Sequence, residues 1–190
     1  MKKTHLFAIT FIALLFVSCS NGGKNPATED STESKAYKEL AFGMSVEKIK
    51  EMGYIKTDRS ESKSDQGFDM YPSEIKDMAG VNFDYNYLCF SENQLVQVLL
   101  VKTTMKKDEA LEVWDTIYNS TKIKYGEPIK ETLSNDKKAQ WNIRNKTIFC
   151  TYEKIYFSDY YSNAVKIMNQ KLMDDIAKSK LEKYKENTDI

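Results

Sequence analysis

Apolar residues recur along this chain with two periods, one typical of helices and one typical of strands. Helical spacing, with apolar residues three or four positions apart, covers three segments: 45–52, 108–125 and 172–185. The first follows Ser45, a favourable N-cap residue, and the second ends at Gly126 and Pro128, which stop a helix. We also expect Pro72 to open a helical turn over 73–78.

Strand-like runs fill most of the remaining chain. The clearest is Val81–Phe90, and one face of that run carries Phe83, Tyr85, Tyr87 and Cys89. Turn residues join it to the aliphatic run 95–101, which predicts an antiparallel hairpin. A meander and a last strand are expected after the long helix, over 129–133, 139–143, 147–153 and 163–169.

This order predicts an α+β fold with helices packed on one face of an antiparallel sheet. A single domain would span 37–190. Its order of elements suggests a tandem α-then-β repeat, with one unit over 37–106 and a second over 107–170. A C-terminal surface helix over 171–187 would follow.

The first residues have the pattern of an export signal. Lys2 and Lys3 precede an apolar core over 6–17, which is too short for a membrane-spanning helix and suits a signal peptide. We therefore expect a signal peptide over 1–18. Residues 19–36 would be a disordered tether, because they are polar and contain no aliphatic residue larger than alanine after Cys19.

The end of that core, Phe16-Val17-Ser18-Cys19, resembles a bacterial lipobox, although Phe16 departs from the commoner leucine. The resemblance implies cleavage before Cys19 and acylation of Cys19, which would anchor the chain stably in a lipid bilayer. An uncleaved or conventionally cleaved signal is the alternative. Ser20, in place of aspartate, points to the outer rather than the inner membrane of a Gram-negative envelope.

Charge and composition exclude several kinds of function. Removing 1–18 takes away two lysines and the only histidine, His5, which leaves 26 basic and 28 acidic residues. That balance gives no electrostatic footprint for nucleic acid. Without histidine the usual serine and cysteine nucleophile pairs are absent, so we expect no enzyme and no cofactor. An enzyme that uses carboxylates alone is the least favoured alternative.

Two further cysteines, Cys89 and Cys150, lie in strand-like runs. An exported protein can form a disulfide between them if their strands are neighbours. Two separate buried thiols are the favoured alternative.

Aromatic residues are the main candidates for binding, with 12 Tyr, 9 Phe and 2 Trp in the chain. A predicted loop carries four of them: Tyr156, Phe157, Tyr160 and Tyr161. For Tyr160 and Tyr161, packing in the core is an equal alternative to exposure. Tyr85 and Tyr87 on the first strand are a second pair, but packing beneath the long helix beside Trp114 is the favoured interpretation for them. Exposed tyrosines are common at interaction hot spots.

Two segments resemble a known family: Phe42–Lys50, and Lys124–Pro128 at the end of the long helix. Both look like segments of small Gram-negative lipoproteins whose domain is similar to the SmpA/OmlA outer-membrane assembly lipoproteins and the β-lactamase-inhibitor protein. The resemblance implies that one sheet face is free to bind protein. It carries over no functional residue.

From the sequence we expect a membrane-anchored envelope lipoprotein that acts by binding another envelope protein. A glycan- or small-ligand-binding lipoprotein is the second hypothesis.

Overall fold

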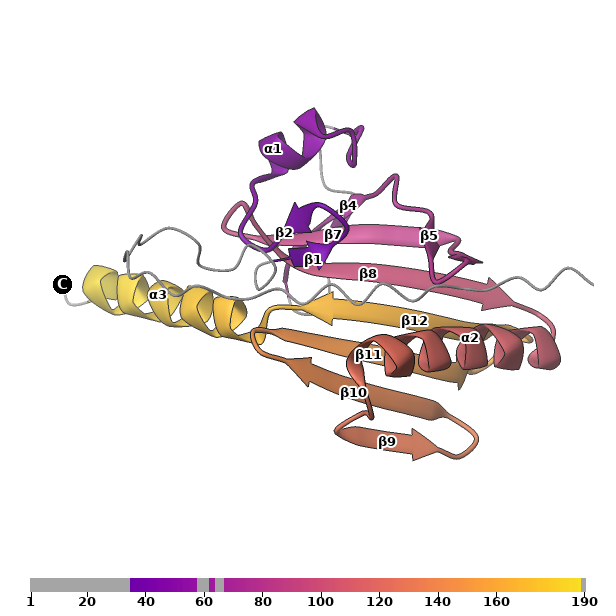
Figure 1. Cartoon of the computed structure of the whole chain (residues 1–190). Helices are drawn as coiled ribbons and strands as arrows, with labels where there is room; N and C mark the ends of the chain where they lie inside the picture. Colours follow the sequence, from indigo (N-terminus) through magenta and orange to yellow (C-terminus); the bar gives the residue numbers. More distant parts are fainter. Residues whose placement is uncertain (1–34, 58–61, 64–66, 189–190) are drawn as a thin grey trace, which may run out of the picture.

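The structure is a computed structural model that describes residues 35–57, 62–63 and 67–188. Its centre is an eight-stranded antiparallel sheet with the strand order β3-β4-β7-β8-β12-β11-β10-β9 (Figure 1). The strands of this sheet are β3 (Ser62–Lys63), β4 (Asp69–Pro72), β7 (Tyr85–Ser91), β8 (Gln94–Thr104), β9 (Lys130–Leu133), β10 (Lys137–Ile143), β11 (Lys146–Lys154) and β12 (Tyr161–Met168). The predicted α+β class is confirmed.

Three helices and two short hairpins complete the described chain. The helices are α1 (Val46–Glu51), α2 (Lys107–Tyr125) and α3 (Gln170–Thr188). The hairpins are β1 (Lys35–Tyr37) with β2 (Leu40–Ala41), and β5 (Asp77–Met78) with β6 (Val81–Asn82). All three predicted helices are present. Ser45 accepts a hydrogen bond from the amide of Lys48 as the N-cap of α1.

The sheet divides at its centre. The four strands that precede α2 form one half and the four that follow it form the other. The last strand of each half, β8 and β12, meet as antiparallel neighbours, with Leu100 opposite Val165. The two halves therefore form one continuous sheet.

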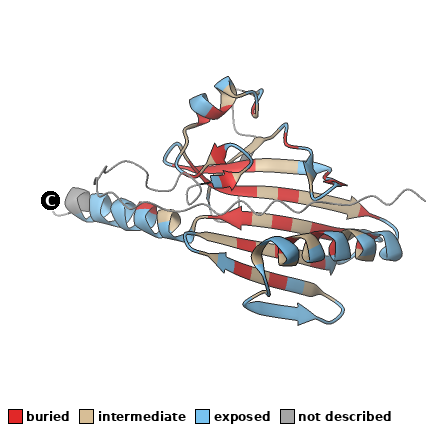
Figure 2. Cartoon of the chain, viewed as in Figure 1, coloured by how far each residue is buried: buried red, intermediate tan, exposed pale blue. Residues whose placement is uncertain are grey.

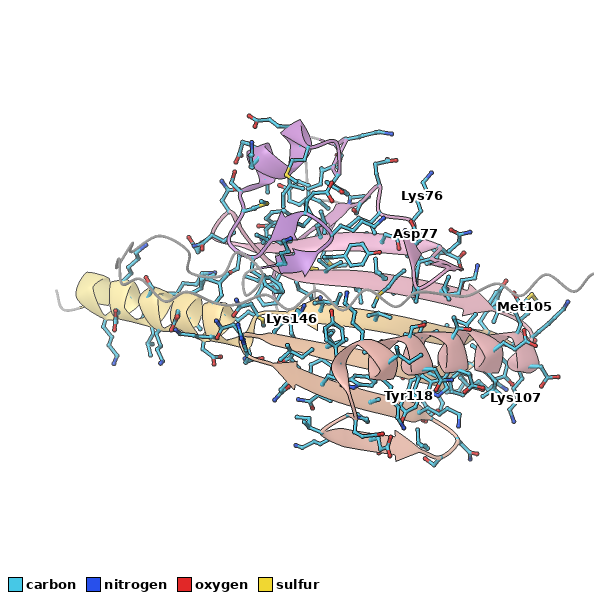
Figure 3. The ribbon with its side chains drawn as sticks, in the orientation of Figure 1. Lys76, Asp77, Met105, Lys107, Tyr118 and Lys146 are labelled. Atoms are coloured by element: carbon cyan, nitrogen blue, oxygen red, sulfur yellow. The ribbon has the colours of Figure 1, made fainter. Side chains whose placement is uncertain are left out.

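Helix α2 covers one face of this sheet. Its buried residues are Ala110, Trp114, Ile117 and Thr121, which join a core that includes Leu100, Trp141, Ile148 and Val165. The indole N–H of Trp141 donates to the carbonyl of Gly126 at 2.9 Å, so the end of the helix is bonded to β10. Tyr118, which Figure 3 labels on α2, stacks on Trp114 with 5.5 Å between ring centroids. Edge strand β9 is exposed along its length (Figure 2).

Helix α3 follows β12 directly and extends beyond the end of the sheet (Figure 1). Asn169 accepts a hydrogen bond from the amide of Leu172 and so caps the helix. Ile176 is buried, and Lys180 forms a 3.1 Å ion pair with Glu92 in the β7–β8 turn. The expected surface helix therefore contacts the rest of the protein as far along as Lys180.

Three details of the sequence prediction are wrong. Residues 73–78 form no helical turn, because the amide of Ser73 bonds to the carbonyl of Asn86 and β5 begins at Asp77. The tether cannot extend to residue 36, because Ala36 is buried within β1. Val81–Phe90 is two strands: Phe83 lies between β6 and β7 and joins the main core.

The predicted signal peptide, Cys19 and residues 20–34 of the tether lie outside the described residues. Within the part of the chain that the structure describes, no helix is both long enough and apolar enough to cross a membrane. The tandem repeat stays a prediction.

Candidate binding surface

The loop between β11 and β12 is held by its own hydrogen bonds. The amide of Ile155 donates to the carbonyl of Tyr160 at 2.9 Å and closes the loop. Inside it, the amide and the hydroxyl of Ser158 both donate to the Ile155 carbonyl, at 3.2 and 3.0 Å. The hydroxyl oxygen of Ser158 also accepts from the amide of Tyr160 at 3.2 Å. The loop therefore presents its aromatic side chains from a well-bonded backbone.

Those side chains are strongly exposed. Tyr156 is 83% exposed and Phe157 is fully exposed, while Tyr160 is 45% exposed. Met105, just after the end of β8, is also exposed, and the pairing of Tyr161 with Thr104 brings this residue to the same end of the sheet (Figure 3). We call Met105, Ile155, Tyr156, Phe157 and Tyr160 the aromatic tip. Large apolar side chains grouped outside a core are typical of interaction sites.

Tyr161 differs from its neighbours in the predicted loop. It is the first residue of β12, and its ring stacks on buried Tyr152 with 6.0 Å between centroids and 12° between planes. The prediction of Tyr161 as an exposed binding residue is therefore wrong, and the alternative, packing against the core, is correct. Met105 and Ile155 take part in the tip instead. Met105 has no local signal in the sequence, because it follows a strand that ends in threonines.

An open cavity of about 570 Å³ lies beside the tip. It is bounded on one side by the β9–β10 turn with Asn135 and Asp136, and on the other by the loop with Tyr156, Ser158 and Asp159. Carboxylates, an amide and an aromatic ring thus border one hollow.

The second aromatic pair lies on the sheet face opposite α2. Asn163 and Cys150 define the helix side, because they bond or contact Ala110 and Thr121 of α2. Cys150 pairs with Val165, which pairs with Leu100, so Leu100 also lies on the helix side. The next residue of β8, Val101, faces the other side, and Tyr85 pairs with Val101.

Packing of Tyr85 and Tyr87 beneath the helix beside Trp114, the interpretation that the sequence favoured, is therefore wrong. Tyr85 is 52% exposed, and Tyr87 is half-buried opposite Leu99. Half-buried Phe149 of β11 shares this face, so apolar groups from both halves of the sheet lie on it.

A disulfide between Cys89 and Cys150 is excluded by the fold. The two residues lie on opposite faces, and strands β8 and β12 separate β7 from β11. Both thiols are free and buried. Burial raises the pKa of each thiol to about 12, despite hydrogen bonds from Gln97 to Cys89 and between Thr121 and Cys150.

Among the described residues, no group of three or more histidine, cysteine, aspartate or glutamate side chains is placed to hold a metal ion. The predicted lipidation site, Cys19, lies outside the described residues.

No protein-family model, no curated protein and no solved structure matches this chain.

Proposed function

We propose that this protein is a membrane-anchored envelope lipoprotein that acts as a non-catalytic protein-binding module. The observation that carries the proposal is the aromatic tip. An exposed phenylalanine and tyrosine on a loop closed by its own hydrogen bonds offer apolar contact area at little cost in conformational entropy. Tyrosine and other aromatic side chains are enriched in interaction hot spots.

The open sheet face supports the same function. Tyr85, Tyr87 and Phe149 provide a broad, partly apolar surface on the side away from α2. The resemblance to the SmpA/OmlA lipoproteins and the β-lactamase-inhibitor protein implies protein binding through such a face. In this proposal the aromatic tip supplies the hot-spot residues for the partner protein, and the sheet face supplies further contact area.

Duplication of an α-then-β unit is part of the proposal. Its support is the strand order, in which β8 and β12 end the two halves and meet at the centre of the sheet. The first unit would then be 37–106 and the second 107–170.

The membrane anchor is inferred from the lipobox-like segment that ends at Cys19. A stable anchor needs two acyl signals or more, because a single chain binds reversibly. Intact mass and membrane fractionation of wild type and Cys19→Ala test it. We expect acyl mass and membrane retention in wild type and the loss of both in the variant. An unchanged mass and distribution in the variant would refute the anchor and the envelope location.

Protein binding is tested by replacing the tip. Tyr156→Ala with Phe157→Ala should weaken capture of the envelope partner by about thirtyfold or more, since loss of a single hot-spot residue already costs about 2 kcal/mol. Ile123→Ala, at an 87% exposed position on α2, is the matched control and should retain the partner. Equal retention by both variants would remove the tip from the proposal.

Glycan binding is a second candidate, favoured by the cavity beside the tip. Sugars stack on aromatic rings and hydrogen-bond to carboxylates and amides, and Tyr156, Asp136, Asp159 and Asn135 border that cavity. Asp136→Asn with Asp159→Asn should abolish binding on a glycan array while leaving protein capture intact. Absence of any glycan bound by wild type would reject this candidate.

A further inference from the structure

We propose that a second site, on the helix side of the sheet, binds an amphipathic anion: an apolar chain that ends in a carboxylate or phosphate. The site is a pocket of about 540 Å³ between β1, the β5–β6 turn and the last turn of α2. That volume is within the range of roughly 300–1,000 Å³ that small-molecule sites occupy. We call it the basic pocket.

The charge of the basic pocket comes from four lysines: Lys35, Lys38, Lys124 and Lys146. None of the described residues that line it is acidic. Lys38 forms an ion pair at 3.4 Å with Asp77 of β5, a residue that Figure 3 labels. Within the described part of the chain, the other three lysines have no carboxylate within ion-pair distance.

Two of these lysines are organised around one aromatic ring. The ammonium groups of Lys124 and Lys146 each lie 5.2 Å from the centroid of the Tyr125 ring. Lys146 also donates to the Tyr125 hydroxyl at 3.5 Å. Two like charges near the same ring repel each other, and an anion bound in the pocket that both lysines line would offset that repulsion.

The carbonyl end of α2 opposes anion binding, because a helix C-terminus carries about half a negative charge. Three whole positive charges, which have no carboxylate partner among the described residues, act against that half charge in the same pocket. A lysine ammonium acts as a point charge and not as a bidentate fork, so the pocket selects charge and does not distinguish carboxylate from phosphate by geometry.

The remaining walls suit an apolar chain. Ala36 and Ile167 are buried residues of β1 and β12, and Met78 and the Tyr37 ring are half-buried. Binding of an alkyl chain against these side chains is favourable because it removes apolar surface from water. The combination of apolar walls and lysine ammonium groups matches an amphipathic anion better than an inorganic ion or a neutral lipid. The inference does not depend on the proposed protein binding.

The test is photolabelling of the full-length protein with a diazirine-bearing dodecanoate, followed by peptide mass mapping. We expect adducts on the peptides that contain 35–38 and 120–125. Dodecanoate or dodecyl phosphate should suppress them, and the stronger competitor identifies the headgroup. Dodecanol should not suppress them.

Two matched double variants distinguish binding in the basic pocket from a general attraction of the probe to positive charge. Lys124→Gln with Lys146→Gln should reduce labelling at least about tenfold, since two charge-assisted contacts to the headgroup are lost. Lys107→Gln with Lys178→Gln removes the same charge at exposed positions elsewhere and should leave labelling unchanged. Labelling scattered over the chain, equal suppression by dodecanol, or equal loss in both variants would overturn the proposal. Partner capture through the aromatic tip would be unaffected by any of these outcomes.

Discussion

The side-chain amide of Asn163 donates a 3.0 Å hydrogen bond to the carbonyl of Ala110, and both residues are completely buried. This bond joins the first turn of α2 to the central strand β12. The side-chain oxygen of Asn163 has no partner among the described residues. The contact that fixes the helix on the sheet therefore also leaves an unsatisfied polar atom, and both features have a measurable effect on stability.

Asn163→Ala should lower the free energy of unfolding by about 1–3 kcal/mol, because it removes the bond and leaves a cavity. Asn163→Leu should cost less, since it fills the volume and removes the unsatisfied oxygen. Urea unfolding measures both, with exposed Asn142→Ala as a near-neutral control. A leucine variant at least as unstable as the alanine variant would show that the hydrogen bond dominates.

The buried thiols of Cys89 and Cys150 predict a loss of stability at alkaline pH. Their pKa is about 12 in the folded protein and about 8.5 in an unfolded chain, so the unfolded chain releases these protons first as the pH rises. The stabilisation is complete below about pH 8.5 and declines as the pH approaches 12.

Unfolding curves between about pH 8 and 11 test this. The double variant Cys89→Ala, Cys150→Ala should be less stable at neutral pH because of its cavities, but its stability should fall less steeply with pH. Parallel curves for variant and wild type would assign the alkaline loss to other groups, such as Tyr37, whose pKa burial also raises to about 12.

Replacement by alanine should lower the stability of the protein at Tyr161 but hardly change it at Phe157. Tyr161→Ala removes the ring stacked on Tyr152 and should cost about 2–4 kcal/mol of stability. Phe157→Ala alters a fully exposed side chain and should change stability by less than about 0.5 kcal/mol. Thermal unfolding distinguishes the two, and a destabilised Phe157→Ala would place that ring in a packed environment.

Asp84 links the start of β7 to β8. Its carboxylate accepts from the Thr103 amide at 2.8 Å and from Lys102 at 2.9 Å. Burial by itself would raise the pKa of Asp84, but the bonds from Thr103 and Lys102 outweigh it and lower the pKa. The stabilisation is therefore present above about pH 4 and is lost as the pH falls through the lowered pKa.

Asp84→Asn should remove this pH-dependent contribution to the free energy of unfolding. We expect the contribution to be below about 1 kcal/mol because the Asp84 side chain is partly exposed. Urea midpoints at about pH 3 and pH 7 give the comparison. If the difference between the two pH values is the same in variant and wild type, Asp84 does not contribute to it.

The sequence predicted the helices and most strands because their periodicity and caps are local signals. Ser45 and Gly126 mark helix ends through their own backbone chemistry, and the structure confirms both. The α+β class followed from the order of those elements.

The sequence could not predict the contacts between segments that are distant in the chain. Period two placed Tyr85 and Tyr87 on one face but could not say which face α2 would cover. Cys89 and Cys150 had strand-like surroundings, yet only the strand order shows that two strands separate them. Met105 and the lysines of the basic pocket come from segments distant in the chain, so their grouping has no local signature.

The measurement that tests the central claim most directly is photocrosslinking in cells from position 157 of the full-length chain. A photoreactive residue at Phe157 should crosslink to an envelope protein, and one at exposed Ile123 should not. Cys19→Ala should reduce the crosslink by releasing the chain from the membrane. A missing crosslink at 157, or the same crosslink from both positions, would contradict an anchored protein that binds through its aromatic tip.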